Sequence, residues 1–162
     1  MILQVYTIIH TLISLVGIFT GFVVLFGLLA GKRLDGWTKW FLITTVLTSA
    51  TGFGFPLHHF GAPHVVGIIS LIVLAVAIYA RYPRHLAGSW RWIYIVSALI
   101  ALYLNVFVGV VQAFQKVPAL QAFAPTQTEP PFQLAQLVVL ALFIVLTIVA
   151  TIRFHDRTAA AI

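Results

Sequence analysis

Residues 3–30 read LQVYTIIHTLISLVGIFTGFVVLFGLLA, an apolar run that contains no Asp, Glu, Lys or Arg. A helix needs about 20 mostly apolar residues to cross the hydrocarbon core of a bilayer, so this run can span a membrane with some tilt. The run is continuous rather than alternating, which favours a helix over a strand of a membrane barrel. No Lys or Arg precedes it and it exceeds the apolar part of a signal peptide, so we expect a retained first span.

Four further apolar runs have the length of a span, and proline stands near most of their ends. Because its ring cannot continue a helix, proline is typical of first turns and of positions just beyond last turns. We predict spans over residues 3–30, 37–55, 64–80, 90–114 and 132–152. The segment that begins at Pro118 predicts a short helix at the membrane surface, followed by an ordered cap. The predicted fold is an all-α bundle of five transmembrane helices, formed by residues 1–162 as one domain.

Composition agrees with this assignment. Hydrophobic residues make up 62% of the chain and charged residues only 7%, whereas soluble domains carry roughly a quarter charged residues. The chain is therefore not a water-soluble domain. It contains no cysteine, which excludes disulfides, thiolate catalysis and cysteine-bound metal.

The positions of the charges predict how the chain threads the membrane. Nine basic and three acidic residues give a net charge of +6, and all the basic residues except Lys116 fall on one side of the predicted spans. Basic residues favour the cytoplasmic side, so we expect the N-terminus outside and the C-terminus inside a cell inner (plasma) membrane. The tryptophans Trp37, Trp40, Trp90 and Trp92 fall at the same inner surface. Because the cations are spread over helix ends, we expect the lipid bilayer rather than nucleic acid as their partner.

Small and polar residues recur three or four positions apart within the spans. Lipid tails give helices no hydrophobic reason to associate, so such stripes are expected to face other helices. The first span carries Thr7, His10, Ser14, Gly17 and Gly21; the second carries Thr45, Thr48, Ser49 and Gly52; the fourth carries Tyr94, Ala98, Ala101, Asn105, Gly109 and Gln112.

Imidazoles and amides are expensive in hydrocarbon, so their positions indicate a candidate site. We predict a pocket that opens to the outside between the first, fourth and fifth spans and binds a ligand or cofactor through His10, Asn105, Gln112 and Gln136. Side chains suited to a transition metal fall in the predicted outer loops and would lie at the pocket mouth: His58, His59, His64 and Glu129. Haem, quinone or a transition metal are the cofactors that these groups suit.

Several functions remain open at this stage. The favoured hypothesis is a membrane protein that holds a small apolar or amphipathic ligand, or a cofactor, in that pocket. The alternatives are a haem- or quinone-binding redox subunit, a structural or assembly subunit of a membrane complex, and a passive channel. The chain has no carboxylate inside a predicted span, no G-x-S-x-G, no P-loop and no H-E-x-x-H, so we assign no catalytic residue and favour a protein that is not an enzyme. A homo-oligomer and a larger membrane complex are both compatible with it.

Overall fold

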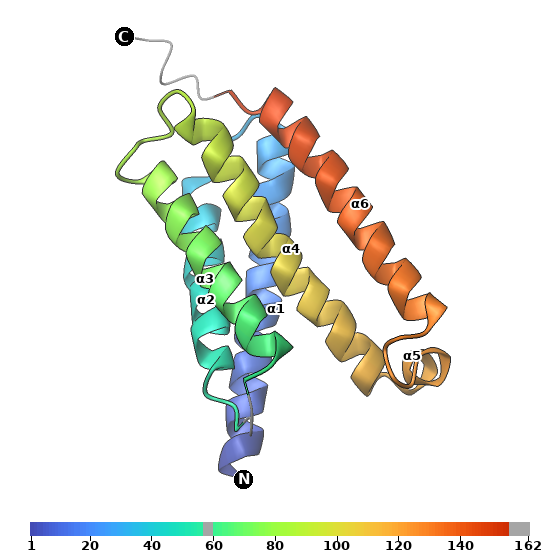
Figure 1. Ribbon diagram of the computed structural model, residues 1–162. Helices are drawn as coiled ribbons and strands as arrows, with labels where there is room; N and C mark the ends of the chain where they lie inside the picture. Colours follow the sequence, from blue (N-terminus) through green and yellow to red (C-terminus); the bar gives the residue numbers. More distant parts are fainter. Residues whose placement is uncertain (57–59, 156–162) are drawn as a thin grey trace.

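The computed structural model describes residues 1–56 and 60–155, and this part of the chain is helical, without strands. Figure 1 shows five long helices running lengthwise, with a short sixth helix at one corner. The bounds are α1 Ile2–Leu29, α2 Asp35–Gly52, α3 Ala62–Arg81, α4 Trp90–Lys116, α5 Pro118–Phe123 and α6 Pro130–Arg153.

Four of these helices, α1, α3, α4 and α6, are long and apolar enough to cross a membrane. The predicted all-α, multi-pass character is therefore confirmed. Helix α2 has 18 residues but is not among these four, because five threonines and the charged Asp35 and Lys39 lower its hydropathy. The short helix predicted at Pro118 is present as α5.

Most helix ends lie within two residues of the predicted bounds, but the end of α2 does not. We predicted this helix to run to residue 55, whereas it ends at Gly52 and the chain then turns. The N–H of Gly54 donates to the Thr51 carbonyl at 3.0 Å, which closes the turn. The Tyr6 hydroxyl lies against Gly54, in the space that a Cβ would need, so a glycine is required there.

We name the two ends of the bundle by their residues. The His10 end contains the starts of α1, α3 and α6 and the ends of α2 and α4; the Arg81 end contains the opposite termini. Helix α1 is antiparallel to its neighbour α2, and the turn between them begins with Gly31 at φ 69°. The Lys32 N–H then donates to the Gly27 carbonyl at 2.7 Å, so the orphan carbonyls at the end of α1 are satisfied as in a Schellman motif.

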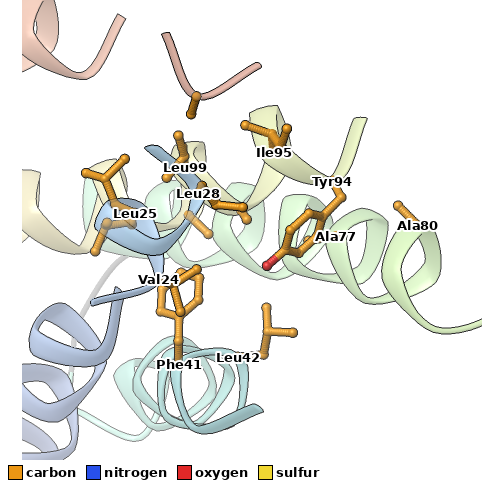
Figure 2. Close-up of a cluster of buried hydrophobic side chains, with 14 of the residues drawn as sticks. Val24, Leu25, Leu28, Phe41, Leu42, Ala77, Ala80, Tyr94, Ile95 and Leu99 are labelled. Atoms are coloured by element: carbon orange, nitrogen blue, oxygen red, sulfur yellow. The ribbon is translucent and has the colours of Figure 1, made fainter. Parts of the chain in front are cut away.

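The apolar core lies between α1, α2, α3 and α4, toward the Arg81 end (Figure 2). Small residues let the helices approach closely there. A Cβ on Gly21 would overlap Leu102 and lie 3.0 Å from two ring carbons of Phe41. The predicted inward orientation is confirmed for the members of the stripes that lie toward the Arg81 end, because these residues are buried: Gly17, Gly21, Thr45, Tyr94, Ala98, Ala101 and Asn105.

Helix α6 packs on α4 and α1, and Figure 1 shows it running alongside α4, inclined to α1. Its start, together with α5 and the end of α4, lies away from the start of α1. Beyond Asn105, therefore, α4 diverges from α1 toward the His10 end. This divergence decides which predicted site residues meet.

Candidate functional site

His10 is held at the His10 end by the last turn of α2. Its Nδ1 lies 2.8 Å from the Thr51 hydroxyl, and the Tyr6 hydroxyl donates to the Thr51 carbonyl at 2.5 Å. The ring of Phe55 packs edge-to-face with both Tyr6 and His10, with centroids 5.0 Å apart in each case. One residue of α2, Thr51, thus positions two polar side chains of α1.

The neighbouring hydrogen bonds favour one tautomer of His10. The Thr51 hydroxyl lies 2.6 Å from the Leu47 carbonyl, to which it can donate its single proton. When it donates there, it accepts the hydrogen bond from His10, and Nδ1 carries the proton. In the neutral ring, Nε2 then presents a lone pair, which can accept a hydrogen bond or bind a metal. The His10 residue as a whole is half-buried.

One turn further along α1, Ser14 pairs with Asn105. The Ser14 hydroxyl donates to Asn105 Oδ1 at 2.9 Å and joins α1 to α4 in the middle of both helices. Gly17 lies beside this pair, and a Cβ added to it would be 3.1 Å from Asn105 Nδ2 and 3.3 Å from the Thr45 hydroxyl. Both of these polar atoms are buried without a hydrogen-bond partner among the described residues.

The two predicted glutamines take different positions. Gln136 of α6 is buried and donates from Nε2 to the Phe107 carbonyl of α4 at 3.2 Å, while its Oε1 has no partner within the described residues. Gln112 is exposed, although it continues the Asn105 stripe of α4. The structure therefore holds His10 against the end of α2, joins Ser14 of α1 to Asn105 of α4, and places Gln136 at the contact of α6 with α4.

The candidate metal ligands do not gather within the described residues. His58 and His59 lie outside them. His64 Nδ1 accepts from the Gly61 N–H at 3.1 Å, as the third residue of a helix often does for its N-cap, and its ring stacks on Phe60. Among residues 1–56 and 60–155, no three His, Asp or Glu side chains come together.

Glu129 caps its own loop. Its carboxylate accepts hydrogen bonds from the Thr126 hydroxyl at 2.8 Å and from the Thr126 and Thr128 N–H groups. Desolvation by neighbouring atoms opposes the effect, but these donors lower the pKa of Glu129 below its usual value of 4.5. The ordered cap predicted before α6 is confirmed by these contacts.

A second polar cluster, at the Arg81 end, was not predicted from the sequence. Arg81 is 1% exposed, donates from Nη2 to Asp35 Oδ1 at 2.5 Å, and lies over the ring of Tyr94, 5.1 Å from its centroid. The buried position of Arg81 was hard to predict from the sequence, because Arg81 stands close to other cations at a helix end. Asp35, an acid directly after a basic turn, was the available clue.

Two surface hollows lie elsewhere in the described part of the chain. One, of about 340 Å³, is lined by residues 29–31, Arg153 and His155 at the Arg81 end. The other, of about 530 Å³, lies on the seam of α1 and α2. Neither lies between α1, α4 and α6 at the His10 end, where the sequence predicted a pocket.

Comparison with protein-family models, with curated proteins and with solved structures finds no match for this chain. Any functional assignment therefore rests on the geometry of the chain itself.

Proposed function

We propose that this chain is a five-span integral membrane protein, N-terminus outside, that binds a small ligand or cofactor at its outer, His10 end. The observation that carries the proposal is the imidazole of His10, whose Nδ1 is held 2.8 Å from the Thr51 hydroxyl. A histidine oriented through one ring nitrogen by a second residue is the usual arrangement for an imidazole that binds a ligand through the other nitrogen.

The inclusion of α2 as the fifth span rests on its position and its hydrogen bonds. It packs against both α1 and α3, and the Thr44 and Thr48 hydroxyls donate to carbonyls four residues earlier in the same helix. These hydroxyls therefore need no water, so α2 tolerates a bilayer despite its threonines. With five spans, the helix ends and turns that carry most of the cations all lie at the Arg81 end. Basic residues favour the cytoplasmic side, so this end would face the cytoplasm.

The ligand is defined by what Nε2 recognises. A lone pair accepts a hydrogen bond from a hydroxyl, such as that of a reduced quinone, or binds the iron of a haem. The hypothesis of a redox subunit and the favoured hypothesis of a ligand-binding protein therefore both depend on Nε2 of His10. A transition metal held by several histidines is less well supported, because no such group forms among the described residues.

Native mass spectrometry of the detergent-purified protein tests the ligand. We expect a bound small molecule on the wild type that His10→Phe loses and His155→Phe keeps, since His155 is exposed at the opposite end. Thr51→Val, which removes only the group that orients the ring, should weaken retention. Circular dichroism verifies that each variant is folded. Equal retention by wild type and His10→Phe overturns the proposal, and a spectrum without a Soret band removes haem.

Reporter fusions test the threading independently. Fusions after Gly36 and Leu86 should report the cytoplasm, and fusions after Phe60 and Gln121 the outside. If all four positions report the same side, the five-span arrangement is wrong.

A further inference from the structure

The hollow on the seam of α1 and α2 has the dimensions of a binding site. Its volume of about 530 Å³ falls in the usual range for small-molecule sites, roughly 300–1,000 Å³. It is separate from the His10 site, because its α1 residues begin at Val16, toward the middle of the helix. Six residues line it: Val16, Phe19, Thr20, Gly36, Trp37 and Trp40.

The walls of this groove are apolar and aromatic. Phe19 and Trp37 pack edge-to-face across the seam with ring centroids 6.1 Å apart, and both are exposed, as is Trp40. The Thr20 hydroxyl donates to the Val16 carbonyl at 2.7 Å, so its proton is already used within α1. A groove of this kind selects a hydrocarbon chain rather than a polar solute.

Gly36 leaves the groove open. A Cβ added at this position meets no atom within 4 Å. The space beside the glycine is therefore not needed for helix packing, unlike the space beside Gly21. A larger side chain at residue 36 would occupy the groove without displacing the chain around it.

A cation stands next to the groove residues of α2. Lys39 lies between Trp37 and Trp40 in the sequence and is exposed, although it does not itself line the groove. The nearby carboxylate does not neutralise it, because Asp35 pairs with Arg81 at 2.5 Å and with Arg33 at 2.9 Å. Two tryptophans beside a free-standing lysine are typical of the level of lipid headgroups.

We propose that this groove binds one anionic phospholipid, with an acyl chain between Phe19 and Trp40 and its phosphate at Lys39. An apolar groove with an exposed lysine beside its tryptophans is complementary to a hydrocarbon chain that carries a negatively charged headgroup. The proposal does not depend on the function assigned to the His10 end.

The probe is phosphatidylglycerol, titrated against phosphatidylcholine into the detergent-purified full chain, with bound lipids counted by native mass spectrometry. We expect one phosphatidylglycerol to bind more tightly than the rest and to be lost in Gly36→Leu. Val145→Leu, which enlarges an exposed side chain on α6, is the matched control and should keep it. Gly36→Ala provides a smaller filling of the groove if the leucine variant does not fold.

The charge is tested with a pair of lysines. Lys39→Gln should weaken the first phosphatidylglycerol about five-fold, the effect of roughly 1 kcal/mol for one lysine near an anionic surface. Lys116→Gln changes the net charge equally, from an exposed lysine at the His10 end, and should have no effect. In parallel, brominated acyl chains should quench tryptophan fluorescence less in Gly36→Leu than in the wild type. Equal weakening by both lysine variants, or undiminished binding in the residue-36 variants, overturns the proposal.

Discussion

Replacement of Gly21 by alanine tests the packing that holds α1, α2 and α4 together. The added methyl group would overlap Leu102 and lie 3.0 Å from two ring carbons of Phe41, nearer than carbon atoms in ordinary contact, which are 3.4 Å or more apart. Leu102 is 0% exposed and Phe41 1%, so neither has free space to move into. At least one of the three helices must therefore shift.

The expected cost follows from these contacts. Overpacking by a methyl group in a well-packed core costs about 1–3 kcal/mol, and the better helix propensity of alanine offsets roughly 1 kcal/mol. Gly109→Ala gains the same propensity, but its Cβ lies at an ordinary 3.6 Å from Ile18. The difference between the two variants should therefore be about 1–3 kcal/mol in the free energy of unfolding.

Unfolding in mixed micelles with increasing dodecyl sulfate, followed by far-ultraviolet circular dichroism, measures this difference. We expect Gly21→Ala to unfold at a lower dodecyl sulfate fraction than both the wild type and Gly109→Ala. If the two alanine variants unfold together, α1 does not approach α4 and α2 as closely as described.

Three further predictions address the polar groups. Ser14→Ala should lower the free energy of unfolding by about 0.6–1.7 kcal/mol, as for other interhelical hydrogen bonds in membranes, and a double-mutant cycle with Asn105→Ala should show that the two losses are not additive. Asp35→Asn should destabilise the chain by about 1–3 kcal/mol, less than for a fully buried pair because the Asp35 carboxylate is 71% exposed; an unchanged melting temperature in detergent would contradict the pairing with Arg81. Because the pKa of Glu129 is lowered in the folded loop, its stabilising effect is complete above pH 4.5 and disappears as the pH falls through that lowered pKa; NMR shifts of the loop amides should report this transition, which Glu129→Gln should abolish.

The presence of the long helices could be predicted from the sequence. The signals used for them, which are long continuous apolar runs with proline near their ends, are local in the chain. The end of α2 could not, since Phe53 and Phe55 continue the apolar run up to Pro56. What ends the helix is a contact with another one: Tyr6 of α1 lies over Gly54 and bonds the Thr51 carbonyl. Such a contact depends on the register between α1 and α2, which a single sequence does not contain.

The same reason explains which site residues were predicted. Ser14 and Asn105 stood on stripes of small residues, so their inward orientation followed from helix periodicity. Gln112 stood on the same stripe but is exposed, because α4 diverges from α1 toward its end. Thr51, the partner that holds Nδ1 of His10, was not singled out, because one threonine among five in α2 carries no signal of its own.

The separation of the two polar clusters discriminates between the remaining functions. His10 lies toward one end, the Ser14–Asn105 pair lies near the middle, and Arg81 lies at the other end. Between the Ser14–Asn105 pair and Arg81 the bundle is filled mainly by buried apolar side chains, among them Val24, Leu25, Phe41 and Leu99 (Figure 2). Buried hydroxyls in this layer, such as those of Thr20 and Thr44, donate to carbonyls of their own helices. A polar solute crossing the layer would exchange its hydration for few partners, so a passive channel through one copy of the chain is disfavoured. A ligand that enters from the His10 end and leaves by the same end meets no such barrier. The packing therefore favours a function carried out at one face of the membrane.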